Sequence, residues 1–410
     1  MKKFFVLMAI GPYVIGLKAD QHAVCSVPVA DLIGEPLSAH HIKHNPAHYY
    51  QTFPINGDPV VVNRISQLLF NEIVTIVDQP EPHHEDEVCV RLTQHYYCTL
   101  FDSTPRNTYW MLKKNLIPLG QLKSNQLPTP IDYRTPSDHA AVITLSQPWF
   151  DKVTHQRYAA GTRFRLCPDQ KKYSSYYTVY RFTDQKKSAV TRIPKRIALQ
   201  TGNLTADEHI ALFVRLLKEY AHPDVGYIPY AWGGMSATDF YTSDYQEKTV
   251  KTKNNQYAYI SVKKPHEGPH SGFDCSSLIM RLAQIAGLPF YYRNTLAINN
   301  VLRPLKNGER IEPGDIISIR GHVMVIVDPH RNRIVEARTQ THGYGRVHEL
   351  PIKKIFAQTH TMHDVLQAHF TKNPVDRLDA KGNVIAQLPV TILKLRSIYE
   401  KNNNGLPAQA

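Results

Sequence analysis

One cysteine at the expected start of a helix constrains this chain more than any other feature. Cys275 lies between Asp274 and Ser276, and the apolar residues that follow recur at helical spacing until Gly287 and Pro289 supply a stop. Cys275 therefore falls in the first turn, where backbone N–H groups and the positive end of the helix dipole stabilise a thiolate. We expect a lowered pKa for this thiol, and an oxyanion-binding site at the same N–H groups.

A histidine on a strand further along supplies the second half of a catalytic pair. His322 begins a run of alternating apolar residues, which predicts a strand, and residues 328–332 indicate a hairpin turn. If the two residues flanking that turn pair with each other, Glu336 faces the same side as His322 and orients its imidazole. A loop one residue shorter turns Glu336 away. His342 and His348 are weaker candidates for this role, since they lie in or beyond the next turn.

An aromatic segment before two glycines is the third signal. Tyr230 and Trp232 precede Gly233 and Gly234, which permit a close approach of the backbone. The aromatic rings either wall a substrate cleft or, for Trp232, pack in the core. A thiol at a helix start with an imidazole on a facing strand is the arrangement that a cysteine hydrolase needs.

The chain divides into β-rich and mixed parts. Residues 26–125 and residues 126–203 each show short alternating runs separated by turn residues, which predicts two small all-β barrels. The pattern changes at residue 204, where Thr205 and Glu208 form a capping box before a helix. We expect an α+β fold in which a helix packs on an antiparallel sheet.

Three further boundaries follow from composition. Residues 204–370 form the domain that carries the cysteine, and residues 237–270 are expected to be an inserted loop within it. Residues 371–410 form a C-terminal extension whose polar end is expected to be disordered.

The N-terminus is typical of an export signal. Lys2 and Lys3 precede an uncharged run, so we assign residues 1–19 to a signal peptide and expect a periplasmic or secreted protein. The formal charge of +13 becomes +10 without this segment, because three lysines and no acidic residue leave with it. Such a surface favours an anionic cell-wall polymer, although a basic surface without a dedicated partner explains it as well. No stripe of basic and aromatic residues indicates nucleic acid.

The cysteines and histidines do not predict a metal site or a cofactor. No Cys-x-x-Cys pair occurs among the five cysteines, which disfavours structural zinc. Cys89 and Cys98 either bridge a hairpin or are buried as small apolar residues. In the run from His83 to Glu87, neighbouring strand residues point to opposite faces, so a compact metal site is not expected.

Four motifs occur in a characteristic order: Tyr230-Ala231-Trp232-Gly233-Gly234, Phe273-Asp274-Cys275-Ser276, Pro313-Gly314-Asp315 and Gly321-His322-Val323. In this order they resemble the NlpC family of papain-like cell-wall cysteine peptidases, over residues 204–367. Residues 27–32, 67–72 and 146–150 resemble the bacterial Src-homology-three barrels that precede the catalytic domain in some members.

The resemblance implies a γ-D-glutamyl–diamino-acid endopeptidase that acts on peptidoglycan stem peptides. It implies Cys275 as nucleophile, His322 as base and Glu336 at the third catalytic position, with Tyr230, Trp232, Asp274 and Ser276 lining the substrate site. In multi-barrel relatives, the aspartate at the position of Asp274 faces the free amine of a terminal L-Ala, and the first barrel closes one end of the cleft. Such enzymes are restricted to released muropeptides.

Three departures from the family pattern leave other functions open. Ser277 replaces a usual glycine, Glu336 stands where histidine is common, and residues 237–270 are longer than usual. One alternative is thiol-dependent transpeptidation or amidation of the same substrates by an amine acceptor. The other is a catalytically silent protein that binds the cell wall.

Overall fold

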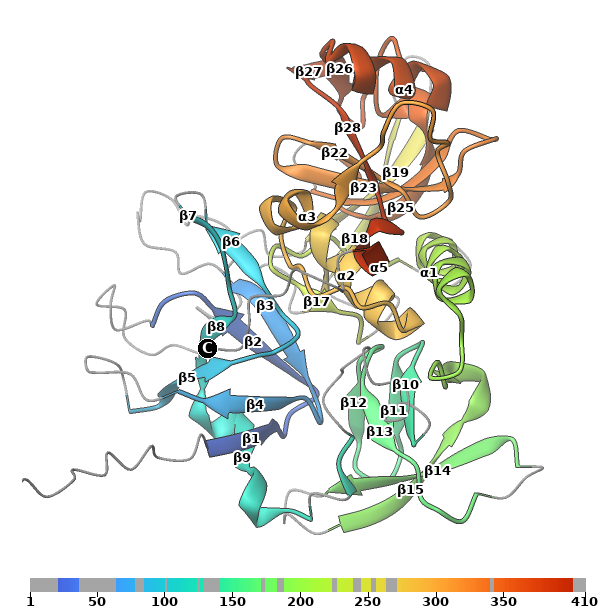
Figure 1. The fold of residues 1–410 in the computed structure, drawn as a ribbon. Helices are drawn as coiled ribbons and strands as arrows, with labels where there is room; N and C mark the ends of the chain where they lie inside the picture. Colours follow the sequence, from blue (N-terminus) through green and yellow to red (C-terminus); the bar gives the residue numbers. More distant parts are fainter. Residues whose placement is uncertain are drawn as a thin grey trace, which may run out of the picture.

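A computed structural model describes residues 21–36, 64–77, 85–99, 102–123, 126–128, 141–170, 174–182, 188–222, 227–238, 245–251, 256–262, 271–339 and 343–400. The predicted signal peptide, the histidines at 40, 41, 44, 83, 84 and 342, and residues 401–410 lie outside these ranges. Figure 1 shows a β-rich unit from the N-terminal part, a second β-rich unit below the centre, and a larger unit carrying most helices.

The first unit is built from strands. They are β1 (Gln21–Cys25), β2 (Val29–Ile33), β3 (Arg64–Leu69), β4 (Ile73–Ile76), β5 (Glu87–Arg91), β6 (Tyr97–Thr99), β7 (Asp102–Arg106), β8 (Thr108–Leu112) and β9 (Leu116–Pro118). Seven of them form one antiparallel sheet in the order β3-β2-β8-β5-β4-β1-β9, and β6 pairs with β7. The predicted β-rich character is confirmed, whereas closure into a barrel stays a prediction.

The second unit is also all β in its described residues. Its strands are β10 (Val142–Leu145), β11 (Trp149–Asp151), β12 (Gln156–Tyr158), β13 (Arg163–Arg165), β14 (Tyr176–Phe182), β15 (Ser188–Pro194) and β16 (Ala198–Leu199). They form a three-stranded sheet, β13-β10-β16, and two hairpins. Phe70 of the first unit stacks on Phe182 and meets Tyr158 edge to face, so the two β units share a core.

The third unit carries the helices. They are α1 (Ala206–Ala221), α2 (Cys275–Ala286), α3 (Thr295–Val301), α4 (Met362–Thr371) and α5 (Ser397–Glu400). The strands are β17 (Met235–Ser236), β18 (Tyr245–Lys251), β19 (Gln256–Val262), β20 (Gly272–Phe273), β21 (Arg303–Pro304), β22 (Ile316–Ile319), β23 (His322–Asp328), β24 (Arg333–Arg338), β25 (Arg346–Pro351), β26 (Val375–Leu378), β27 (Val384–Leu388) and β28 (Thr391–Lys394).

A six-stranded antiparallel sheet forms the centre of this unit. Its order is β21-β28-β22-β23-β24-β25. Val323 and Val325 pack with α1 and α2 on one face, whereas Met324 and Ile326 pack with α4 on the other. This alternation along β23 places helices on both faces, because each side of the strand is apolar. The mixed architecture of helices packed on an antiparallel sheet agrees with the expected fold class.

The predicted local signals at α1 and β23–β24 are confirmed. Thr205 caps α1, and its backbone N–H donates to Glu208 Oε2 at 2.7 Å. In the hairpin, Val325 pairs with Val335, which sets Glu336 opposite the residue before Val325, as expected. At the turn, a register shift pairs Asp328 with Arg333 in place of the expected pair.

Residues 371–400, which the sequence analysis separates as an extension, supply one strand of the central sheet and a separate hairpin, β26–β27. Strand β28 pairs with β22, so the boundary at residue 370 does not divide the structure. Asp315, from one of the family-like motifs, accepts a hydrogen bond from Lys394 Nζ at 2.9 Å and another from the Leu395 N–H at 3.3 Å. That motif therefore anchors the last strand.

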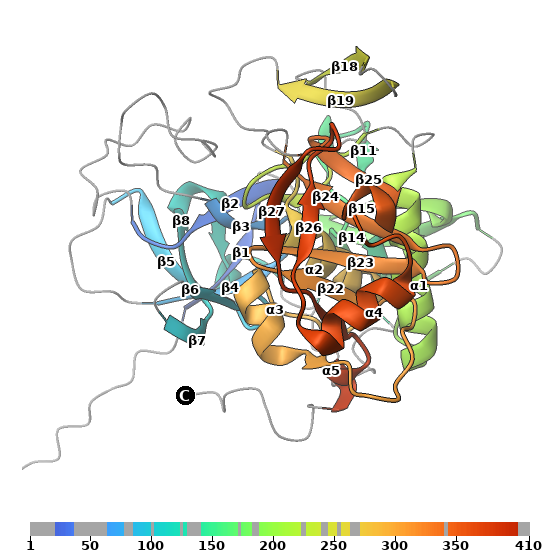
Figure 2. The same cartoon turned by 90° about the horizontal axis from the view of Figure 1, so that it is seen from above.

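The insertion at 237–270 contains regular structure. Strands β17 and β20 pair at its base, and β18 and β19, of seven residues each, form an antiparallel hairpin within it. Figure 2 shows this hairpin standing apart from the central sheet. The expectation of a plain loop is corrected, and the tyrosine, threonine, valine and isoleucine residues of these two strands favour extended structure.

A buried ion pair joins the first unit to helix α2. Arg281 Nη1 lies 2.8 Å from Glu72 Oε1, and Arg281 also donates to the backbone carbonyl of Met235. Both charged side chains are almost completely buried. Separation of the two units would expose or unpair these charges, at a cost of about 3–5 kcal/mol if one partner remained buried.

Candidate active site

Helix α2 places Cys275 at its first position, as predicted. Asp274 is the N-cap, and its Oδ1 accepts the backbone N–H groups of Ser276 at 3.1 Å and Ser277 at 2.8 Å. Gly287 ends the helix in the left-handed conformation, with φ of 87°. Because the cap already uses the N–H groups of Ser276 and Ser277, these two do not form the expected oxyanion site.

Burial governs the charge state of the Cys275 thiol. Removal from water is the largest effect and the neighbouring Asp274 carboxylate adds to it, so the pKa of this thiol is raised to about 12 even though a hydrogen bond from the Val323 backbone lowers it. The expected lowering of this pKa by the helix start is therefore wrong. The resting group is a neutral thiol that needs a base.

His322 and Glu336 form a closely coupled pair. His322 Nε2 lies 2.5 Å from Glu336 Oε2, and His348 Nε2 lies 3.0 Å from the other carboxylate oxygen, Oε1. Glu336 and His348 are direct cross-strand partners on β24 and β25. The structure thus brings Glu336 to His322 as expected, and it also adds His348, which the sequence analysis ranked low.

The charge states of this cluster fix which nitrogen of His322 acts as base. Burial raises the pKa of Glu336, but hydrogen bonds from both histidines and the charge of Arg338 outweigh it, so the pKa lies well below its ordinary value. Burial lowers the pKa of His322 despite the nearby carboxylate. A carboxylate only accepts hydrogen bonds, so Nε2 of His322 carries the proton and Nδ1 offers the lone pair.

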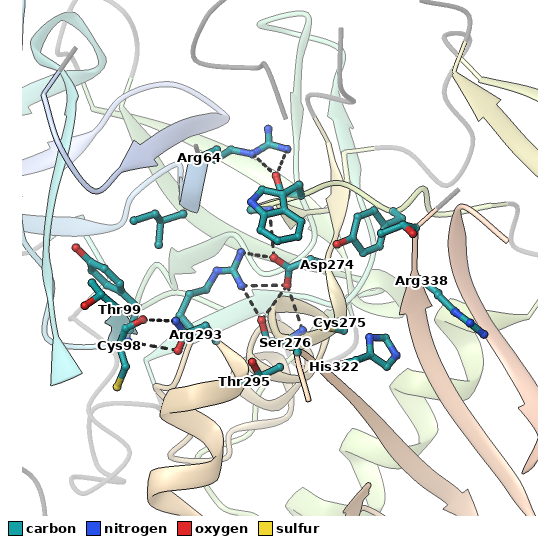
Figure 3. Close-up of a pocket in the computed structure, with 18 of the residues that line it drawn as sticks. Arg64, Cys98, Thr99, Asp274, Cys275, Ser276, Arg293, Thr295, His322 and Arg338 are labelled. Carbon is teal, nitrogen blue, oxygen red and sulfur yellow. Dashed lines mark hydrogen bonds and ion pairs between the residues drawn. The ribbon is translucent and has the colours of Figure 1, made fainter. Parts of the chain in front are cut away.

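Cys275 and His322 line one cavity of about 560 Å³ between the first and third units. The first unit contributes Arg64, Ile65, Tyr97, Cys98 and Thr99 to its wall. Figure 3 shows Cys275 and His322 beside each other in this cavity. The sulfur also contacts the backbone of Val323, the residue that follows His322. The predicted nucleophile and the predicted base therefore line the same cavity.

Two aromatic residues of the predicted substrate site also line the cavity. Tyr230 is 5% exposed, whereas Trp232 is 49% exposed, so plain core packing does not describe Trp232. Arg64 of β3 donates from Nη2 to the Trp232 carbonyl at 2.9 Å and from Nε at 3.1 Å. A Cβ on Gly233 would lie 2.0 Å from the Arg64 carbonyl, which explains the glycine there.

Asp274 is already paired within the protein. Arg293 Nη2 lies 2.8 Å from its Oδ2, Arg293 Nη1 lies 3.0 Å from its Oδ1, and the Gly233 N–H donates to Oδ2 at 3.1 Å. Arg293 Nη1 also donates to the hydroxyl of Ser276 at 2.9 Å. The expectation that Asp274 faces a substrate amine stays a prediction, and its charge is balanced by a guanidinium that the sequence did not signal.

Ser277, the departure behind the thiol, has a clear local role. Its hydroxyl accepts the Asp274 backbone N–H at 2.9 Å and donates to the Gly234 carbonyl. The side chain thus completes the capping box of α2 and ties the helix to the glycine pair.

We expect Ser277→Ala to lower the free energy of unfolding by about 1–3 kcal/mol, because a capping interaction and a buried hydrogen bond are lost. Chemical denaturation followed by circular dichroism measures this change. Ser103→Ala, at an exposed position on β7, serves as the control and should change stability by less than about 0.5 kcal/mol. Equal stabilities of the two variants would show that the Ser277 hydroxyl does not support the helix start.

The cysteines are all free thiols: Cys25, Cys89, Cys98, Cys167 and Cys275. The Cys89–Cys98 bridge is therefore wrong, and burial as small apolar residues is the alternative that holds. Cys275 alone among them is partly exposed. Within the described ranges, no group of three or more metal-binding side chains has ligand geometry, and no helix combines the length and hydrophobicity of a membrane span.

Three arginines of the site carried no usable sequence signal, and His348 was only a weaker candidate. Arg293 precedes α3, Arg338 ends β24, Arg377 lies on β26 and His348 lies on β25. The three arginines line the cavity, and the pairing of β24 with β25 brings His348 to Glu336. If the strand register had been extended from β24 to β25, it would have paired His348 with Glu336.

Comparisons with known proteins find similar solved structures, of which two are given below. No protein-family model and no curated protein matches the chain. The chain is similar to the peptidoglycan hydrolase RipB from Mycobacterium tuberculosis, at 21% identity over 39% of this chain and 62% of that chain, with a TM-score of 0.21. It is also similar to an NlpC/P60 endopeptidase from Photobacterium damselae subsp. piscicida, at 10% identity over 80% of this chain and 64% of that chain, with a TM-score of 0.38.

According to their names, one of these structures is a peptidoglycan hydrolase and the other is an NlpC/P60 endopeptidase. The match covers less than two thirds of the length of either structure. At these TM-scores, neither similarity alone assigns an activity to this chain.

Proposed function

We propose that the chain is a cysteine peptidase of peptidoglycan stem peptides, acting on the γ-D-glutamyl–diamino-acid bond outside the cytoplasm. The observation that carries this proposal is the cavity in which a free thiol at a helix start lies with His322, whose far nitrogen is held by Glu336. The four motifs that resemble the NlpC family and the two structural neighbours support the substrate class.

The proposed reaction starts from neutral partners. Nδ1 of His322 accepts the thiol proton as Cys275 Sγ attacks the carbonyl carbon of the γ-glutamyl amide. The tetrahedral intermediate collapses, the C–N bond breaks, and the imidazolium returns its proton to the leaving amine. A water, deprotonated by His322, then hydrolyses the thioester. Glu336 stays charged throughout and stabilises the transient imidazolium.

Mass analysis of the products of L-Ala-γ-D-Glu-diaminopimelate tests the proposal. We expect two products, the dipeptide L-Ala-D-Glu and free diaminopimelate. A dipeptide joined to an added amine would instead indicate transpeptidation or amidation. Binding to isolated cell wall without any cleaved peptide would favour the silent wall-binding protein and exclude the peptidase.

We expect the protein to remain active at a pH below the ordinary pKa of a histidine side chain. Burial holds the pKa of His322 below its ordinary value of 6.5, so the base stays neutral until the solution is more acidic than that. The thiol, with a pKa raised to about 12, does not ionise at neutral pH. We expect kcat/KM to fall with a midpoint below about 6.5 on the acid side and to stay level up to about pH 9. A midpoint above pH 7 would contradict this assignment of the base.

A further inference from the structure

The cavity continues past the thiol to a second group of arginines. Arg338 and Arg377 line it together with Thr339 and Ile385. Ile385 belongs to β27 and Arg377 to β26, so the hairpin of the C-terminal segment forms this end of the wall. Figure 3 places Arg338 and Thr99 on opposite sides of Cys275, so this end lies away from the first unit.

The two guanidinium groups are incompletely satisfied. Arg338 is 2% exposed and donates from Nη2 to the carbonyl of Leu378, the residue after Arg377. Within the described part of the chain, Arg338 Nε and Nη1 and Arg377 Nε are buried without a hydrogen-bond partner. Unsatisfied buried donors of this kind are rare in folded proteins, and a ligand that accepts hydrogen bonds accounts for them.

At this end of the cavity, positive charge also exceeds negative charge. Arg293 faces Asp274, and Arg64 faces Asp31 at 3.4 Å, so the first-unit end of the cavity is close to neutral. Beyond the thiol, Arg338 and Arg377 share one carboxylate, that of Glu336, whose Oε1 lies 3.9 Å from Arg338 Nη1. Burial lowers the pKa of Arg377, as expected for a guanidinium that lacks a full counterion.

We infer that Arg338 and Arg377 form a carboxylate-binding subsite for the diamino-acid residue that leaves on cleavage. This inference rests on the proposed function and on the substrate orientation that the resemblance implies, with the peptide amino terminus toward the first unit and the leaving residue toward the β26–β27 hairpin. Diaminopimelate carries two carboxylates, and a planar guanidinium binds a carboxylate through paired hydrogen bonds. Ile385 covers the aliphatic part of the same residue.

Turnover of two peptides tests this subsite. The peptides are L-Ala-γ-D-Glu-diaminopimelate with free diaminopimelate carboxylates and the same peptide with those carboxylates amidated. We expect the native protein to show roughly tenfold to a hundredfold higher kcat/KM for the free acid. Arg377→Gln should remove that preference, mainly through KM, so that the two peptides are turned over with similar kcat/KM. Arg377→Lys should keep part of the preference, because charge remains without the paired donors.

Arg215→Gln, at an exposed position on α1, is the matched control and should leave both rates unchanged. Thermal unfolding of each variant shows whether it is folded. If Arg377→Gln does not fold, the two peptides are compared with Arg377→Lys. Equal losses for both peptides in Arg377→Gln, or no preference in the native protein, would overturn the subsite while leaving the proposed peptidase intact. Turnover of neither peptide by the native protein would overturn the proposed function, and the subsite with it.

Discussion

Cys275→Ala will abolish cleavage of the γ-D-glutamyl–diaminopimelate bond, with a fall in kcat of at least about 10⁴-fold. The proposed path forms a covalent thioester, and no other thiol lines the cavity except Cys98, which is buried and hydrogen-bonded to the Ser103 carbonyl at 3.1 Å. Alanine removes the nucleophile and adds no volume, so the fold should be retained. A discontinuous assay that separates the peptide products by mass measures the residual rate.

Alkylation gives an independent measure of the same thiol. Iodoacetamide should label Cys275 before the four buried cysteines, because it alone is partly exposed. The His322→Ala variant should label more slowly at neutral pH, since the base that removes the thiol proton is gone. Cys167→Ala is the control and should leave both labelling and turnover unchanged. Undiminished turnover after complete alkylation of Cys275 would exclude the thiol mechanism.

Glu336→Ala will lower kcat by roughly 10²- to 10⁴-fold. Without the carboxylate, the Nε2 proton of His322 has no acceptor, the tautomer that exposes Nδ1 is no longer favoured, and the transient imidazolium loses its counterion. KM should change much less, because Glu336 lies behind the imidazole. Steady-state kinetics on the stem peptide gives both quantities.

Glu349→Ala is the matched control for Glu336. Glu349 lies on β25, the strand beside Glu336, and pairs with Arg333 at 2.8 Å, away from the cavity. A partly exposed ion pair of this kind contributes about 0–1 kcal/mol, so turnover should change less than about twofold. Glu336→Gln provides a second test, because it keeps the shape of the side chain and removes only its charge. Similar small effects of Glu336→Ala and Glu349→Ala would show that another group orients the base.

Local signals in the sequence predicted the elements that begin the site. The cap of α1 at Thr205, the start of α2 at Cys275 and the side of β24 on which Glu336 lies depend on residues only a few positions apart. Each of these features is set by capping and by strand alternation, which a single sequence shows directly.

The remaining parts of the site depend on distant contacts. Arg377 lies about a hundred positions after Cys275 and is placed by the pairing of β26 with β27 and by a bridge to Phe356, and Arg293 meets Asp274 only after α2 has packed. The prediction of a lowered pKa for the Cys275 thiol was wrong for the same reason. The helix start is a local property, whereas the loss of water around the sulfur depends on the whole surrounding structure.

The contact between Arg281 and Glu72 also limits how such a chain can be dissected. The nucleophile's own helix takes its counterion from the N-terminal β unit, more than two hundred positions earlier. A shortened chain lacking that unit would leave the Arg281 guanidinium on α2 without its carboxylate partner and would lose the Arg64 support of Trp232. The N-terminal β unit is therefore not an independent module for wall recognition. A protein without it would need other residues to complete the cavity wall and to pair with Arg281.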